Sequence, residues 1–295
     1  MRTGILIDEL GVGFDAMTAQ AREAAKLGYR TLWLAQRGGW DALTALPALG
    51  AAAPGVELGT CVVPTYPRHP ITMAAQALTV QAATGVPVHL GVGLSHRSIV
   101  EHEFGYSYDR PIRHLREYLQ ALNPLLRGEK ADVHGESLTA AGGLTTPGAE
   151  RPAVLVGSVS PGSTRLSGEL ADGVITTWAG PRALGEFVVP TITEAAAGRP
   201  APRVVTGQLV CVTSEVDERR AWVEENYGAA ATVPAYRAIL DRDGYTKVSD
   251  SVIAGDEETV RRQVKSLEDA GATELLVMPF GSAEDQARTR ELLAS

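Results

Sequence analysis

The segment over residues 151–178 (RPAVLVGSVSPGSTRLSGELADGVITTW) holds the side chains best spaced for binding chemistry. An apolar run ends at Gly157 and Ser158, and Pro161 then opens a helical pattern that stops before a second apolar run over 174–177. A glycine-serine turn between a strand and a helix start presents free backbone N–H groups and hydroxyls, which suit an anion, most often a phosphate. An ordinary capped helix between two buried strands explains the same pattern, so the segment alone leaves both interpretations open.

Further residues with acid–base or binding chemistry stand where other apolar runs end. These positions are Asp8, Glu9, Gln36, Arg37, Trp40, Cys61, Val62, Tyr66, Gly93, Ser95, His96, Thr177 and Trp178. Imidazole and phenol groups are common proton donors, and arginine binds anions and carbonyl oxygens. The six histidines show no HExxH pattern, and no GxSxG motif follows a strand-like run, so neither a metal site nor a hydrolase triad is predicted. His114 is expected on a surface or in a loop.

Short apolar runs alternate with helical patterns along the chain, and this alternation predicts how those residues are positioned. Eight strands are expected, over residues 4–8, 30–35, 56–63, 88–94, 153–156, 174–177, 204–212 and 274–280. Eight strands alternating with helices over 295 residues predict an α/β fold, a (β/α)8 TIM barrel, with a doubly wound sheet as the runner-up. The stretch 129–152 is predicted as an insertion after the fourth βα unit. We expect a single domain over residues 1–295.

Composition narrows the classes of function. The net charge of −8 disfavours a nucleic-acid surface, and no apolar stretch reaches the ~20 residues of a membrane span. Cys61 and Cys211 lie far apart in apolar runs, which is typical of free thiols in a reducing compartment. We therefore expect a cytoplasmic protein whose partner is a small-molecule substrate, with neither nucleic acid nor a membrane as a partner.

Four segments resemble a known family. They are LGTCVVPTYPRHP (58–70), VHLGVGLSHRSIVEHEFGYSYDRPIRHLREYL (88–119), VLVGSVSPGSTRLSGELADGVITT (154–177) and IAGDEETVRRQVKSLEDAGATELLVMPF (253–280). In this order they are similar to the luciferase-like flavin-dependent oxidoreductases, and the resemblance covers nearly the whole chain. The TYPRHP and GLSHRS stretches are more similar to the branch that uses the deazaflavin coenzyme F420, common in actinobacteria. The resemblance implies a barrel of the bacterial luciferase-like type with coenzyme F420 as cofactor, and FMN as the alternative.

The resemblance also implies where the cofactor binds. Thr60-Cys61-Val62 matches the family's bulge and non-prolyl cis peptide behind the central ring, which places the cis bond between Cys61 and Val62. The phosphate-bearing tail is expected along the segment 157–177. Trp178 is expected either to cover the tail or the ring, or to pack in the core. The full set of expected cofactor-binding residues is Gln36, Cys61, Val62, Gly93, Ser95, Gly157, Ser158, Gly162, Ser163, Thr177 and Trp178.

Departures from the family pattern bear on catalysis. Members that oxidise sugars or alcohols carry an Asp-His pair after the second strand and a Glu after the fourth, where this chain has Gln36-Arg37 and His96. Because that base for alcohol oxidation is replaced, the resemblance favours hydride transfer to an activated acceptor, with a proton from His96 or Tyr66. Arg37 is expected to clamp an anion or carbonyl, and Trp40 matches the family's tryptophan. The alternatives are structural: His96 bonded within its loop, and Arg37 at the surface.

Three functions follow, in order of preference. The first is a coenzyme F420-dependent oxidoreductase acting as a reductase on a small unsaturated substrate, such as an enone or imine. The second is an FMN-dependent monooxygenase of the same superfamily, and the third is a non-catalytic flavin-binding protein. Ala-rich helical faces over 42–53 and 74–83 also suggest a homodimer.

Overall fold

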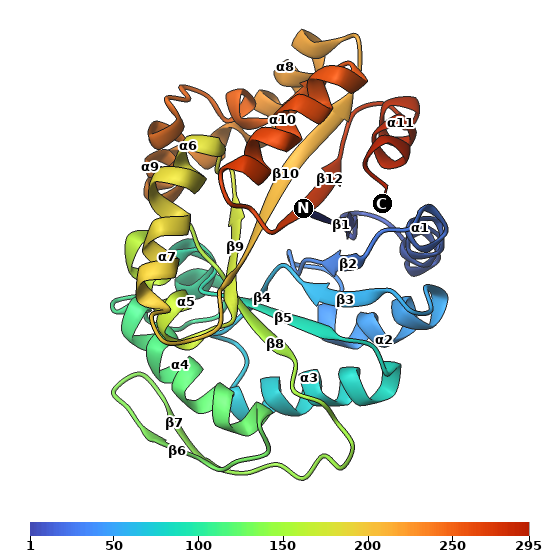
Figure 1. The fold of residues 1–295 in the computed structure, drawn as a ribbon. Helices are drawn as coiled ribbons and strands as arrows, with labels where there is room; N and C mark the ends of the chain where they lie inside the picture. The colour runs from blue at the N-terminus through green and yellow to red at the C-terminus, as the bar shows by residue number, and fades with distance from the viewer. Residues whose placement is uncertain (295) are drawn as a thin grey trace.

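Eight parallel strands close into a barrel in the computed structural model, which describes residues 1–294. In order around the barrel they are β1 (Arg2–Ile7), β2 (Thr31–Leu34), β3 (Glu57–Thr60), β5 (Val88–Gly93), β8 (Ala153–Gly157), β9 (Gly173–Thr177), β10 (Arg203–Val212) and β12 (Glu274–Pro279). Because β10 pairs with both β9 and β12, and β12 pairs with β1, the sheet closes on itself. Figure 1 shows the helices around the outside of these strands. The predicted TIM barrel is confirmed.

Helices form the outer layer. They are α1 (Phe14–Leu27), α2 (Ala42–Ala52), α3 (Pro70–Thr84), α4 (Pro111–Leu126), α5 (Pro161–Leu170), α6 (Pro181–Ala183), α7 (Val189–Ala195), α8 (Val216–Tyr227), α9 (Pro234–Asp243), α10 (Glu257–Asp269) and α11 (Ala283–Leu293). The Asp41 carboxylate accepts a hydrogen bond from Thr44 N at 2.9 Å and so begins α2. Gly28, with a φ of 96°, ends α1 in the left-handed region that favours glycine. Within residues 1–294, the helices are too short or too polar to span a bilayer.

The third predicted strand is interrupted. Residues 56–63 divide into β3 and β4 (Val63–Pro64), and the expected cis peptide bond between Cys61 and Val62 lies between them. A further strand, β11 (Ile253–Gly255), pairs with the end of β10 outside the barrel and was not predicted. Its three residues are too few to show the alternation by which a strand is recognised.

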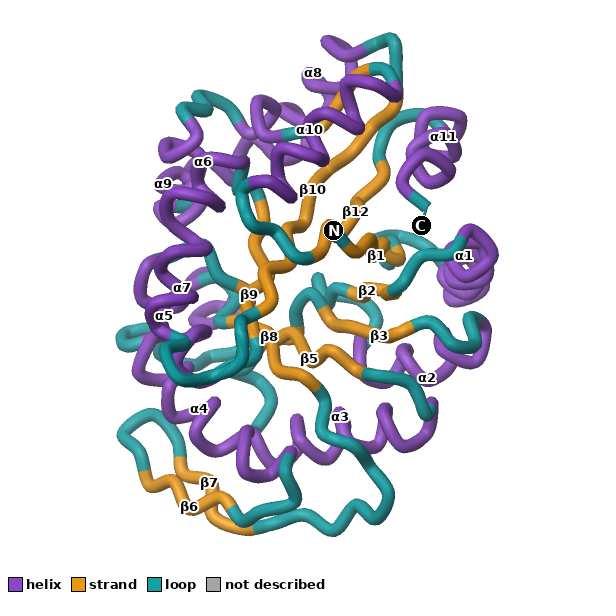
Figure 2. The backbone as a smooth tube through the Cα atoms, in the orientation of Figure 1, coloured by secondary structure: helices purple, strands orange, loops and turns teal. Residues whose placement is uncertain are grey.

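The stretch after α4 forms a hairpin that stands apart from the barrel. β6 (Ala131–His134) and β7 (Thr139–Gly142) pair antiparallel to each other. In Figures 1 and 2 they lie beyond α3 and α4, away from the barrel strands. The predicted insertion over 129–152 is therefore confirmed, and it leaves the barrel strands in their expected order.

The N-terminal end of the barrel is filled. Trp33 occupies the interior there because Gly4 and Gly59 leave it room: a Cβ on either would lie 2.5 Å and 2.4 Å from the indole. The buried Glu274 carboxylate accepts hydrogen bonds from Trp33 Nε1 at 2.9 Å and from Arg203 Nη2 at 2.6 Å. Because side chains fill the N-terminal end of the barrel, a ligand can bind only at the opposite end, where the strands have their C-termini.

Two more residues from the strand starts complete this charged network. Arg203 Nη1 donates to His89 Nδ1 at 2.8 Å, so His89 carries its proton on Nε2, which donates to Glu57 Oε2 at 2.7 Å. Burial lowers the pKa of His89, while the hydrogen bond from His89, foremost, lowers the pKa of Glu57 to about 2. At neutral pH the network therefore holds a neutral imidazole between a carboxylate and a guanidinium.

Candidate active site

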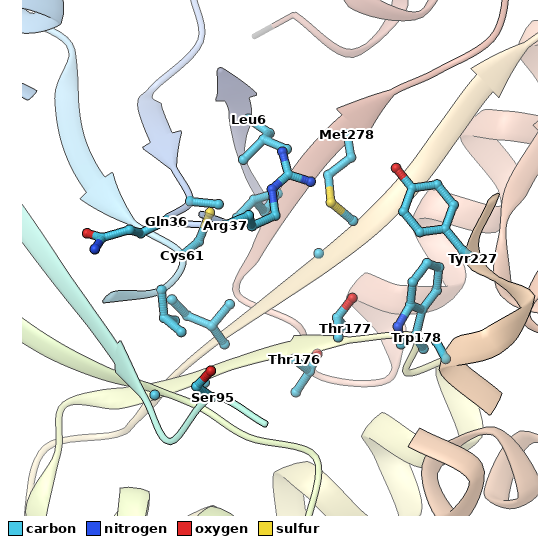
Figure 3. A pocket seen from close by; sticks show the side chains of 18 of the residues that line it. Leu6, Gln36, Arg37, Cys61, Ser95, Thr176, Thr177, Trp178, Tyr227 and Met278 are labelled. Atoms are coloured by element: carbon cyan, nitrogen blue, oxygen red, sulfur yellow. The ribbon is translucent and has the colours of Figure 1, made fainter. Parts of the chain in front are cut away.

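A cavity of about 1390 Å³ opens at the C-terminal ends of the barrel strands. Residues of β1, β5, β8, β9, β10 and β12 line it, together with the segment from α8 to α9. Figure 3 shows side chains from several of these strands around one shared space. The volume exceeds the ~300–1,000 Å³ of common ligand sites, so it can hold a coenzyme and a second small molecule together.

Val62 forms part of the cavity wall between two glycines. A Cβ on Gly93 would lie 2.6 Å from Val62 Cγ2, and a Cβ on Gly157 would lie 3.0 Å from Val62 Cγ1, so glycine at both positions lets Val62 protrude. Cys61 lines the cavity beside it, and burial, followed by the charge of Glu9, raises the pKa of its thiol. Cys61 is thus a neutral, apolar wall residue rather than a nucleophile.

Hydroxyl groups gather where β8 turns into α5. Ser158 Oγ lies 2.5 Å from Ser163 Oγ, which lies 2.7 Å from Ser160 Oγ, and all three residues line the cavity. Since α5 begins with Pro161, its first backbone N–H groups are those of Gly162 and Ser163, and helix starts of this kind bind anions. Gly162 is not among the residues that line the cavity, and a Cβ on it would lie 3.2 Å from Ile112 Cγ1 of α4.

Two residues with left-handed backbone conformations shape the wall. Trp178, with a φ of 60°, follows Thr177 at the end of β9, and both line the cavity. Ser95, with a φ of 61°, lies two residues after the end of β5, and its carbonyl accepts a hydrogen bond from the Tyr108 hydroxyl at 3.1 Å. Conformations that are uncommon for these residue types often mark binding sites.

Arg37 lines the cavity as the partner of a buried carboxylate. Its Nε donates to Glu9 Oε1 at 2.7 Å and its Nη2 to Glu9 Oε2 at 2.8 Å, with Asp8 Oδ1 at 3.3 Å from Nη2. The Glu9 side chain is 1% exposed and that of Arg37 is 34% exposed. Burial opposes the charge of Arg37, but Glu9 outweighs it and raises the pKa of the guanidinium. Gln36 lines the cavity next to this pair, and its Oε1 accepts from Ala42 N at 3.4 Å.

His96 lies in the wall after β5, as predicted. Its imidazole meets the Tyr236 ring edge-on, with centroids 5.6 Å apart. Tyr236 lies near the start of α9, so the contact joins the loop after β5 to the segment after β10 across the cavity. Burial raises the pKa of Tyr236, which therefore stays protonated.

Tyr66 and Trp40, which were expected to act in catalysis, lie outside the cavity lining. The Tyr66 ring stacks on the His114 imidazole at 3.9 Å and on Tyr108 at 5.6 Å, where it supports the loop that carries Ser95. Trp40 Nε1 donates to the Val12 carbonyl at 3.1 Å, which ties the loop after β2 to the loop after β1. The structure therefore brings His96 and Arg37 to the cavity, and places Tyr66 and Trp40 outside its lining.

The expectation for His114 was wrong. His114 is buried in the first turn of α4, where its Nε2 lies 3.0 Å from Thr65 Oγ1. Burial lowers its pKa to about 4, so the ring is neutral. His114 can lie on the buried face of this amphipathic helix because the Tyr66 ring covers its imidazole and the Thr65 hydroxyl forms a hydrogen bond with it.

Comparison with known proteins decides the family. The model of the luciferase-like monooxygenase family matches residues 4–274. This chain belongs to that family. The resemblance drawn from the sequence motifs is thereby confirmed. A Mycobacterium tuberculosis protein described as a putative coenzyme F420-dependent oxidoreductase is 27% identical over 94% of this chain and 92% of its own length. An F420-dependent glucose-6-phosphate dehydrogenase of Beutenbergia cavernae is 34% identical over 54% of this chain and 50% of its own length.

Solved structures share the fold of this luciferase-like chain. An F420-dependent secondary alcohol dehydrogenase with an F420-acetone adduct has a TM-score of 0.83 and 16% identity, over 99% of this chain and 97% of its own. The oxygenating constituent of a Pseudomonas putida Baeyer-Villiger monooxygenase, in complex with FMN, has a TM-score of 0.79 and 18% identity, over 100% and 97%. At these identities the likeness extends to the fold alone.

Sequence reasoning missed the part of this site that follows β10. Trp222, Tyr227 and Tyr236 line the cavity from α8 to α9, and Phe280 joins them from the end of β12. Half of the residues of α8 are charged, and Trp222 and Tyr227 are its only aromatic residues. Aromatic residues on an otherwise charged helix could have indicated that this helix contributes to a binding site. Among residues 1–294, His, Cys, Asp and Glu form no cluster suited to a metal ion.

Proposed function

We propose that this chain is an oxidoreductase that binds coenzyme F420 and passes a hydride between it and a small organic substrate, acting as a reductase. One observation carries the proposal: Val62 protrudes between Gly93 and Gly157, beside the hydroxyl cluster at the start of α5. An apolar side chain with phosphate-binding groups next to it suits a flat ring with a phosphorylated tail. The F420-dependent relatives support this coenzyme over other flavins.

The residues of the cavity fit this coenzyme. Ser158, Ser160 and Ser163, with the backbone N–H groups of the first turn of α5, would hold a phosphate group. Val62 would contact one face of the ring, and Trp178 would keep water from it. When bound, the reduced coenzyme supplies a hydride. The chain itself then has two tasks, which are to orient the acceptor and to provide a proton.

We assign the proton to His96. Of the histidines among residues 1–294, His96 is the one that lines the cavity. Reduction of a polarised C=C or C=N bond adds a hydride to one atom and a proton to the other, and an imidazole can give that proton near neutral pH. Tyr66, the other donor considered, is stacked against His114 behind the wall.

The pairing of Glu9 supports the reductive direction. Oxidation of an alcohol needs a base with a free lone pair near the hydroxyl. Both oxygens of the buried Glu9 carboxylate accept hydrogen bonds from Arg37, and Glu9 is not among the residues that line the cavity. Glu9 therefore acts to position Arg37. The remaining nitrogen of Arg37, Nη1, would bind a carbonyl oxygen of the acceptor.

An FMN-dependent monooxygenase is the second candidate. It is favoured by the fold shared with the FMN complex of the Pseudomonas monooxygenase, and the hydroxyl cluster at α5 would serve the phosphate of FMN equally well. Anaerobic turnover separates the candidates. The protein is mixed with reduced coenzyme F420 and 2-cyclohexenone, and reoxidation of the coenzyme is followed by absorbance. We expect reoxidation that needs both protein and enone. In a separate aerobic assay, oxygenated product that forms only with protein and reduced FMN together would favour the monooxygenase. F420 binding without turnover on enones or imines would favour a carrier protein.

A further inference from the structure

The wall of the cavity is divided by charge. The charged side chains that line it come from the loops after β1, β2 and β5 and from α1 and α11: Asp8, Glu23, Arg37, Arg97, Glu103 and Arg290. Within the described residues, the lining contributed by 176–281 carries no Asp, Glu, Lys or Arg. The part of the wall formed by these residues, called here the uncharged arm, therefore offers no charged side chain to a ligand.

An aromatic row runs through this uncharged arm. The Trp178 and Tyr227 ring centroids lie 5.8 Å apart, Tyr227 and Trp222 lie 5.9 Å apart, and Trp222 stacks on Phe280 at 5.9 Å with an interplanar angle of 21°. All four residues line the cavity. Figure 3 shows the inner pair, Tyr227 above Trp178, facing the space beside Met278.

The row reaches solvent at Trp222. Trp178 is 9% exposed and Phe280 is 4% exposed, whereas Trp222 is 41% exposed. Trp178 follows Thr177, so the inner end of the row borders the surface proposed for the coenzyme. A large aromatic side chain left in water beside a cavity is typical of a ligand contact. Contacts with the Tyr227 and Phe280 rings account for the covered part of Trp222, and not for the exposed part.

We propose that the row formed by Trp178, Tyr227, Trp222 and Phe280 binds a flat, uncharged, fused-ring portion of the substrate. Fused rings pack favourably against aromatic side chains, face-on or edge-on, whereas a phosphate or carboxylate in this arm would lose its hydration without a cation among the residues that form it. The substrate class is accordingly a multi-ring enone or imine rather than a sugar phosphate. The assignment of the reacting group rests on the proposed function; the binding surface does not.

Calorimetric titration of the full chain tests the surface directly. The probes are 2-naphthol, cyclohexanol and glucose 6-phosphate, each with and without coenzyme F420. We expect 2-naphthol to bind more tightly than either other probe, and Trp222→Ala to weaken it by about tenfold. Phe280→Leu is a second variant that should weaken it as well. Tyr106→Ala, which removes an exposed aromatic ring outside the cavity lining, is the control and should leave the affinity unchanged.

The outcomes separate this inference from the proposed function. Preferential binding of glucose 6-phosphate, or 2-naphthol affinity that neither Trp222→Ala nor Phe280→Leu changes in folded protein, would overturn the inference. Coenzyme F420 binding is read independently from its own fluorescence, so a protein that binds 2-naphthol along the row but not F420 would refute the proposed function alone. In turnover, Trp222→Ala should raise the KM of a fused-ring enone, and Tyr106→Ala should leave it unchanged.

Discussion

Glu9 and Arg37 form a two-point ion pair at the rim of the cavity, with hydrogen bonds of 2.7 and 2.8 Å. The Glu9 carboxylate is buried, and the Arg37 side chain is 34% exposed. The pair therefore fixes the direction in which Arg37 presents its remaining nitrogen.

Glu9→Gln should loosen Arg37. We predict a loss of about 1–2 kcal/mol of unfolding free energy, because a partly exposed guanidinium loses its charged partner. The KM of the acceptor should rise more than kcat falls, since Arg37 orients substrate. Asp8→Asn is the control, because the exposed Asp8 contacts Arg37 at 3.3 Å and should change stability by less than ~0.5 kcal/mol. Equal effects of the two variants in denaturant unfolding and steady-state kinetics would contradict this account.

His96→Ala should reduce kcat by about 10²-fold, the size of a general-acid contribution, with coenzyme affinity unchanged. His102→Ala serves as the matched control, because His102 is exposed and lies outside the cavity lining. Stopped-flow reoxidation of the reduced coenzyme measures the effect. Unchanged turnover in His96→Ala would leave His96 with a structural role alone, in its contact with Tyr236.

The base of the barrel should make stability sensitive to acid. The hydrogen bond from His89, foremost, lowers the pKa of Glu57 from 4.5 to about 2. A carboxyl with a depressed folded-state pKa contributes stability above pH 4.5, here about 3 kcal/mol, and loses it as the pH falls toward 2. Denaturant unfolding at pH 7 and pH 3 measures this loss. Glu57→Gln should flatten the dependence, whereas the exposed-residue variant Glu225→Gln should preserve it; identical profiles for both would refute the prediction.

His114 should titrate far below an ordinary histidine. Burial, foremost, lowers its pKa from 6.5 to about 4. The unfolded chain takes up a proton below pH 6.5 while the folded ring does not, so stability should fall as the pH decreases from 6.5 to about 4. The imidazole NMR resonances, assigned by comparison with His114→Gln, provide the midpoint. A midpoint near 6.5 would show that the ring under Tyr66 is open to water.

Much of the barrel could be predicted because its strands are continuous apolar runs. The strand ending at Gly157 and that ending at Thr177 are examples, and their turn residues follow directly in the sequence. The cis bond between Cys61 and Val62 was expected through a family motif rather than from local propensity. Position after a strand also identified Arg37 and His96 as cavity residues, because strand ends meet at one face of the barrel.

The directions in which side chains on loops point could not be predicted from the sequence. Trp40 and Tyr66 follow strands, yet one ties two loops together and the other stacks on His114. Which face a loop residue takes depends on partners distant in the chain, such as Val12 for Trp40. The position of Trp222 also depends on a distant partner. Its helix has the sequence of a charged surface helix, but its ring stacks on Phe280, which follows β12.

The most direct test of the account is a paired titration of the purified full chain with coenzyme F420 and with FMN, followed by the fluorescence of each. If the chain is an F420-dependent oxidoreductase, we expect micromolar or tighter binding of F420 and at least about tenfold weaker binding of FMN. Ser163→Ala should weaken F420 binding, and Ser107→Ala, at an exposed site outside the cavity lining, should not. Tighter binding of FMN than of F420 would contradict the central claim.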